Sequence, residues 1–241
     1  MTSPESIVLE GAGILEFLQH VLDCHAPPST VLVCSTKTAF IESLKRAAAS
    51  VPGGLDEPAL PAHRMRRLWR TPTLRLLSTS RTLKLVFCPD ITHVRAYLAT
   101  YRLALADRPE EADTALRYKS ARPVLAVLDL IQVHRPTTAF SAQGINRSIS
   151  AAVEAAHATA SKLILAEYPA PLEQPDMDLS EAGTDVRQAE QSAWDEAVPI
   201  LNVTTKRLGE LSVGRTVSIR TAAARWCIFQ RLDSCSLGAG L

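Results

Sequence analysis

The chain has 241 residues, of which 46% are hydrophobic and 21% are charged, and its formal net charge is +1. This length and composition suffice for a sizeable core and fit a single α/β domain. No apolar stretch reaches the roughly 20 residues of a membrane-spanning helix, and the N-terminus lacks the pattern of a secretory signal, so we expect no membrane partner.

The cysteines predict buried free thiols in a reducing compartment. Their number is odd, no CxxC pair occurs, and three of them lie in apolar runs; they stand at positions 24, 34, 88, 227 and 235. His20 and Cys24 have a spacing that metal ligands use, and His25 is adjacent. No second ligand pair accompanies them, so we predict a helix end here and no metal site.

Apolar runs alternate with helical segments along most of the chain. The runs at 30–35, 83–89, 123–131 and 162–169 are apolar nearly throughout, which is typical of parallel strands covered on both faces. Between them the sequence predicts helices at 38–49, 90–106 and 142–160, and the middle one places Ile91, Val94, Leu98, Tyr101 and Leu105 on one stripe. This alternation predicts a mostly parallel central sheet flanked by helices.

The C-terminal part has a different character. Residues 170–196 are rich in Asp and Glu and contain one basic residue, Arg187, which predicts an exposed acidic loop. The segments VPILNVTTKRL, RTVSIRT and ARWCIFQRL then predict short strands of an antiparallel extension. We therefore predict one domain over 1–241, with its core at about 28–232.

The turn after the first predicted strand resembles a phosphate-binding loop in outline only. Ser35, Thr36, Lys37 and Thr38 lead from a strand into a helix, but the turn contains no glycine and is too short to surround a triphosphate. Ser35 or Thr36 is expected to cap the helix, and Lys37 could still meet an anion at its N-terminus. We predict no nucleotide hydrolysis at this turn.

Asp129 ends the third apolar run, where a Walker B carboxylate would hold magnesium. Since no glycine loop accompanies it, we predict that Asp129 caps the following turn. With Ser35, Lys37 and Thr38 it forms a degenerate nucleotide site. The sequence Gly11-Ala12-Gly13 precedes a helix, but no strand is predicted before it. Ser141 is expected to be the N-cap of a helix that exposes Gln143 and Arg147.

A basic segment favours nucleic acid as a partner. No acidic residue occurs from Pro58 to Pro89, whereas a loop at 52–72 and the residues after it are rich in arginine. Arginine contacts phosphates and an exposed Trp stacks on bases, so the predicted nucleic-acid site consists of Arg64, Arg66, Arg67, Trp69, Arg70 and Arg75. The alternative is a solvated loop whose arginines pair with the acidic segment 170–196.

The order of these parts resembles the core of RecA-like recombinases and their paralogs. The resemblance rests on the strand and turn at 30–38, the strand ending in Asp129, the segment SAQGINRSISAAVEAAHATASKLILAEYP and the tail RLGELSVGRTVSIRTAAARWCIFQRL. In that fold a long helix and another buried strand follow the Walker B strand. The phosphate-binding glycines of the family are absent from 34–38, so the match is one of pattern.

The resemblance implies a non-catalytic subunit without a cofactor, similar to those of the Shu complex. Such a subunit would pair with another RecA-like paralog, bind DNA and promote assembly of a recombinase filament in the nucleus. RecA-like subunits of the Elongator accessory ring, which contact tRNA, are the alternative within the family. Outside it, a pure assembly scaffold and an active nucleotide hydrolase remain open.

Overall fold

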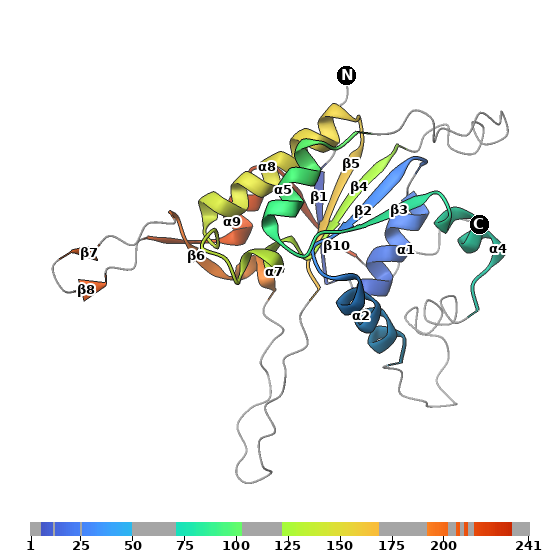
Figure 1. Ribbon diagram of the computed structural model, residues 1–241, viewed down its shortest axis with the longest axis horizontal. Helices are drawn as coiled ribbons and strands as arrows, with labels where there is room; N and C mark the ends of the chain where they lie inside the picture. The colour runs from blue at the N-terminus through green and yellow to red at the C-terminus, as the bar shows by residue number, and fades with distance from the viewer. Residues whose placement is uncertain are drawn as a thin grey trace, which may run out of the picture.

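A computed structural model describes residues 6–11, 13–24, 26–49, 71–102, 122–168, 192–201, 206–207, 210–211 and 215–232. Its centre is a six-stranded sheet in the order β10-β1-β5-β4-β2-β3, and every neighbouring pair in it is parallel (Figure 1). The predicted α/β class with a mostly parallel sheet is confirmed. No helix of the described part is long and apolar enough to span a membrane.

All four apolar runs form strands of this sheet. They are β2 (Ser29–Val33), β3 (Leu83–Phe87), β4 (Val124–Leu128) and β5 (Lys162–Ala166). Strands β2 and β4 are buried at every position, as continuous apolar runs predict. The expectation of full burial is wrong for β3, which lies at the edge of the sheet and exposes Lys84 and Leu85.

The strand that the sequence did not predict is β1 (Ser6–Glu10), which lies between β5 and β10. The core therefore begins well before residue 28. The statement that no strand precedes Gly11-Ala12-Gly13 is also wrong, because these residues connect β1 to α1 (Ile14–Cys24). Gly11 has φ of +68°, a left-handed conformation that glycine adopts without steric cost and that turns the chain sharply here.

Helices cover both faces of the sheet (Figure 1). On one face α1 and α2 (Lys37–Ala49) pack against alternate strand residues such as Val31, Ala126 and Ile164. On the other face α5 (Ile91–Ala99), α8 (Ala142–Ala158) and α9 (Ile219–Ala223) pack against Leu32, Leu125 and their neighbours. The short helices α4 (Leu74–Ser80) and α7 (Leu130–His134) precede β3 and follow β4.

Helix α5 ends earlier than its apolar stripe suggests. Its C-cap is Thr100, so the predicted helix at 90–106 is too long. Ile91, Val94, Leu98 and Tyr101 are buried as expected. Leu105 lies outside the described residues.

The C-terminal extension is only partly antiparallel. Strand β6 (Ala197–Pro199) pairs antiparallel with β9 (Thr216–Ser218), and β7 (Lys206–Arg207) pairs antiparallel with β8 (Glu210–Leu211). The last strand, β10 (Ile228–Arg231), instead runs parallel to β1 and completes the main sheet. The apolar pattern of one segment predicts a strand but not whether that strand pairs parallel or antiparallel, which explains why the direction of β10 was predicted wrongly.

The end of the predicted acidic loop is packed. A 3-10 helix at Ala193–Asp195 buries Trp194 against Phe229, with ring centroids 5.5 Å apart. Asp195 and Glu10 both bind the guanidinium of Arg220, and Glu196 binds Arg135 at 2.7 Å. The prediction of an exposed loop is therefore wrong for residues 192–196, while residues 169–191 lie outside the described ranges.

Helix α8 begins as predicted, and its first turn is tightly packed. The Ser141 hydroxyl accepts a hydrogen bond from the Gly144 N–H at 3.1 Å, and Gln143 and Arg147 are exposed. A Cβ atom placed on Gly144 would overlap the carbonyl oxygen of Ala139. Glycine is thus required here by a close backbone approach.

We expect Gly144→Ala to destabilise the protein, although alanine favours helices more than glycine does. The helix-propensity gain is about 1 kcal/mol, whereas the overlap should cost about 1–3 kcal/mol and displace the Phe140–Ser141 turn. Chemical denaturation measures the difference. Ser150→Ala, at a site with more space on the same helix, is the control and should leave the free energy of unfolding within about 0.5 kcal/mol of wild type.

Candidate functional site

The topology marks one edge of the sheet as a ligand surface. Strands β1 and β2 lead into helices on one face, whereas β4 and β5 lead towards helices on the other. Since β1 neighbours β5 and β2 neighbours β4, the chain leaves these adjacent strands in opposite directions. Open parallel sheets bind ligands at such points, outside the carboxyl ends of the strands.

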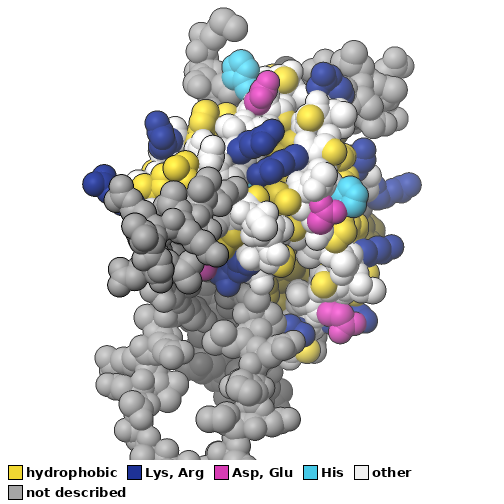
Figure 2. Space-filling model, turned by 60° about the vertical axis from the view of Figure 1, so that its left-hand side comes forward, with side chains coloured by type: hydrophobic (Ala, Val, Ile, Leu, Met, Phe, Trp, Pro, Cys, Tyr) yellow, Lys and Arg dark blue, Asp and Glu magenta, His cyan; other side chains and the backbone are white. Residues whose placement is uncertain are grey.

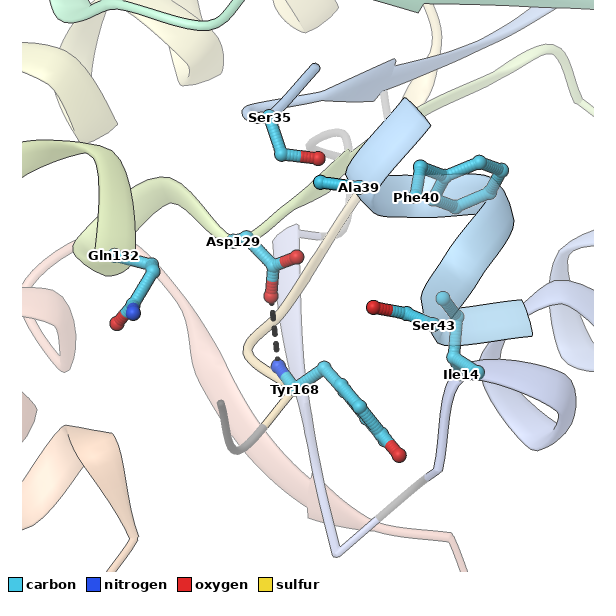
Figure 3. Close-up of a pocket in the computed structure, with 8 residues that line it drawn as sticks. All are labelled: Ile14, Ser35, Ala39, Phe40, Ser43, Asp129, Gln132 and Tyr168. Carbon is cyan, nitrogen blue, oxygen red and sulfur yellow. Dashed lines mark hydrogen bonds between the residues drawn. The ribbon is translucent and has the colours of Figure 1, made fainter. Parts of the chain in front are cut away.

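A cavity of about 170 Å³ lies at this edge, which we call the crevice (Figure 3). It is lined by residues from α1, α2 and α7 and from the ends of β2, β4 and β5, namely Ile14, Ser35, Ala39, Phe40, Ser43, Asp129, Gln132 and Tyr168. The hydroxyl groups of Ser35 and Ser43 and the Asp129 carboxylate point towards its centre. Its volume is below the roughly 300–1,000 Å³ of typical small-molecule sites.

Asp129 occupies the N-cap position of α7 but does not cap it. Its φ of 63° places it in the left-handed region, and its side chain makes no capping hydrogen bond. The carboxylate instead accepts a hydrogen bond from the Tyr168 N–H at 2.9 Å, beyond the end of β5. The position was predicted correctly, and the expected capping role is wrong.

Glu167 supplies the missing cap from the neighbouring strand end. Its carboxylate accepts hydrogen bonds from the Ile131 N–H at 2.7 Å and the Gln132 N–H at 3.4 Å, in the first turn of α7. The two carboxylates therefore bind reciprocally. Asp129, which follows β4, binds backbone after β5, and Glu167, which follows β5, binds backbone after β4. Glu167 was not predicted from the sequence. The pattern that could have identified it is an acidic residue directly after the apolar run KLILA, at the same edge of the sheet as Asp129.

Burial raises the pKa of both acids. The pKa of Asp129 rises to about 6, and the backbone hydrogen bond from Tyr168 opposes this rise only in part. Burial and then the charge of Asp129 raise the pKa of Glu167 well above its usual value. Burial and the same two carboxylates raise the pKa of the Cys34 thiol, so this cysteine is not an activated nucleophile.

Only part of the degenerate nucleotide site comes together. Ser35 and Asp129 both line the crevice. Lys37 and Thr38 lie exposed in and beside the first turn of α2 and do not line it. Thr36 caps α2 by accepting a hydrogen bond from the Ala39 N–H at 3.2 Å, which confirms one of the two predicted caps.

The crevice does not fit a magnesium-bound triphosphate. A phosphate loop supplies a Lys and a Ser or Thr after its last glycine, but here Gly13 is followed by Ile14 and Leu15. Among the described residues that line the cavity there is no Lys or Arg, and one is a carboxylate, Asp129. Among the residues the structure describes, no group of three or more His, Cys, Asp or Glu side chains could hold a metal ion.

A buried network lies under the outer surface of α5 and α8. Arg95 Nε donates to Ser148 Oγ at 3.0 Å, and the same hydroxyl lies 3.0 Å from His134 Nε2. His134 and Ser148 are completely buried, so this Ser-His contact has no access to a substrate. Burial, and next the charge of Arg95, lower the pKa of His134 to about 4. The network serves to hold α5, α7 and α8 together.

The predicted nucleic-acid residues lie largely beyond the described ranges. Arg64, Arg66, Arg67, Trp69 and Arg70 fall in the segment 51–70, and the structure places only the backbone of Arg75, in α4. The structure therefore does not test this part of the prediction.

Comparisons with known proteins identify no family for this chain. No protein-family model matches the sequence, and no curated protein matches it either.

We expect Asp129→Asn to stabilise the folded protein at pH 7. The folded-state pKa is raised, so ionised Asp129 costs stability above pH 6, and this cost disappears as the pH falls towards 3.8. Asparagine keeps the acceptor for Tyr168 and tolerates positive φ, and should gain about 1–3 kcal/mol. Urea unfolding at pH 7 measures this; Asp23→Asn, on the exposed side of α1, should show no comparable gain.

We expect His134 to lower the free energy of unfolding as the pH falls. Its folded-state pKa is lowered, so its contribution is complete above pH 6.5 and is lost as the pH drops towards 4. His134→Gln should be less stable at pH 7, and its difference from wild type should shrink by about 2–3 kcal/mol between these pH values. Equal pH slopes in the two proteins would contradict this assignment. His157→Gln, exposed on α8, is the matched control.

Proposed function

We propose that this protein is a non-catalytic RecA-like subunit that binds DNA, pairs with another RecA-like paralog and promotes the assembly of a recombinase filament. One observation carries the proposal: the crevice where a RecA-like core would bind nucleotide is small, and its described lining contains the Asp129 carboxylate but no Lys or Arg. The α/β core with its central parallel sheet is compatible with the resemblance that the sequence suggested.

The acidic crevice favours a role in assembly over hydrolysis. A triphosphate in the crevice would meet the Asp129 carboxylate and no Lys or Arg among the described lining residues, so its phosphates would lack the cationic partner that a phosphate loop provides. The proposal therefore assigns no cofactor and no catalytic residue.

Binding to DNA is assigned to the basic segment. Arg64, Arg66, Arg67 and Arg70 would neutralise phosphates and release counterions, with Trp69 available for stacking. This mechanism makes affinity depend steeply on salt. The proposal assigns the protein to the nucleus, where its partner paralog and the recombinase would act.

The test is DNA binding by the full chain with these four arginines replaced by alanine. We expect the quadruple variant to remain folded and to lose most of its affinity for single-stranded oligo(dT). The slope of log K against log salt should fall by up to about 3, since each phosphate contact on a single strand contributes about 0.7. Thermal unfolding provides the control for the fold.

Unchanged, salt-dependent affinity in the folded quadruple variant would contradict the assignment to this segment. Clear preference for tRNA over DNA would favour an Elongator-type subunit. If the chain binds a protein partner stably and the resulting complex has no affinity for nucleic acid, a pure scaffold would be favoured. Magnesium-dependent nucleotide turnover that Asp129→Asn abolishes would overturn the non-catalytic part of the proposal.

A further inference from the structure

A second cationic surface lies on the described part of the protein, on the outer side of α5, α8 and the turn after α9. Figure 2 shows Lys and Arg side chains spread over this side of the molecule, with Asp and Glu at fewer places. Three residues define the surface: Arg95 from α5, Arg147 from α8, and Trp226 from the turn that follows α9. We call it the α8 surface.

Arg95 is fixed across the first turns of α8. Its Nε donates to Ser148 Oγ and one terminal nitrogen donates to the Gly144 carbonyl, each at 3.0 Å. A guanidinium has five N–H donors, so three remain without an acceptor among the described residues. The side chain is half-buried and already ordered, and therefore loses little conformational entropy when it binds an anion.

Arg147 brings a second positive charge next to Arg95. Arg147 directly precedes Ser148 and lies about one turn after Gly144, the two residues to which Arg95 donates, and its charge is the second cause, after burial, of the lowered pKa of Arg95. Arg147 is exposed, and no described carboxylate is ion-paired with either arginine. An anion bound between them would relieve this repulsion.

Trp226 flanks the same turns of α8 on the side away from Arg95. Its indole N–H donates to Asn146 Oδ1 at 2.7 Å, which fixes the ring. Asn146 and Arg147 are consecutive and therefore about 100° apart around the axis of α8. Arg147 thus projects between Asn146 on one side and Gly144 and Ser148, which hold Arg95, on the other. Trp226 is 40% exposed and follows another exposed arginine, Arg225.

We propose that the α8 surface binds single-stranded DNA, with Arg95 and Arg147 on adjacent phosphates and Trp226 against an unpaired base. The arginines supply fixed, forked donors and the indole supplies an accessible aromatic face held by its own hydrogen bond. The surface extends across about one helix diameter, roughly 10–12 Å, which corresponds to about three nucleotide steps. This inference rests on the proposed DNA-binding function and gives it a contact site separate from the basic segment.

A single strand fits this surface better than a duplex does. Stacking on Trp226 requires a base whose face is free, and the bases of a duplex present only their edges in the grooves. Electrostatic contacts combined with an exposed aromatic side chain are typical of binding without sequence preference. We therefore expect similar affinities for oligo(dT) and for mixed-sequence single strands.

The experiment measures oligo(dT) binding to the full chain by fluorescence anisotropy for wild type, Arg147→Glu, Trp226→Ala and Arg46→Glu. Arg46 lies exposed on α2, over the opposite face of the sheet, so its reversal changes the net charge by the same amount. Arg147→Glu should weaken binding on the order of tenfold and lower the salt slope by about 0.7 or more. Trp226→Ala should weaken it about fivefold or more. Arg46→Glu should match wild type.

Tryptophan fluorescence gives a second readout. Oligo(dT) should quench the emission of the wild type, and part of that quenching should disappear in Trp226→Phe. This variant keeps an aromatic ring at the site and removes only the indole and its bond to Asn146.

The possible failures are distinguishable. If Arg147→Glu and Trp226→Ala bind like wild type while the quadruple variant of the basic segment does not, the α8 surface is wrong and the proposed function stands. Equal loss in Arg147→Glu and Arg46→Glu would show that only net charge matters and would also overturn the surface. No binding by the wild-type chain at low salt would overturn both assignments to DNA.

Discussion

The reciprocal hydrogen bonds of two carboxylates at the ends of β4 and β5 are the interaction on which the crevice depends. Asp129 binds the backbone beyond β5, and Glu167 binds the first turn of α7, which follows β4. Together they fix how the chain leaves two neighbouring strands. Both are held where burial disfavours their charged forms, so the arrangement costs stability at neutral pH.

The crevice is poorly suited to phosphates. Its described lining includes the Asp129 carboxylate but no Lys or Arg, although the topology makes this edge a place where open parallel sheets bind ligands. Positive charge is found elsewhere, on the outer side of α5 and α8 and in the basic sequence segment. A crevice without a described cationic lining residue, together with a cationic outer surface, suits a protein that binds polyanions without hydrolysing a nucleotide.

The sequence predicted the parts of the fold that depend on local pattern. Continuous apolar runs identified β2, β4 and β5, and side-chain preferences identified the caps Thr36 and Ser141. Features that depend on distant contacts were missed. Strand β1 takes its place in the sheet by pairing with β5 and β10, which lie far along the chain, and Trp194 is buried by Phe229 despite its acidic neighbours. Glu167 directly follows an apolar run, but its contacts with backbone 36 and 35 residues away cannot be read from that local pattern.

The most direct test of the account is to identify what the protein binds in its own cells. We would purify the endogenous protein, digest nucleic acid with nuclease and analyse the bound proteins by mass spectrometry. The account predicts a stable RecA-like paralog in the eluate, with recombinase present in smaller amounts. An eluate dominated by Elongator subunits, or one without any RecA-like protein, would contradict the central claim that this chain is a subunit of a recombinase-paralog assembly.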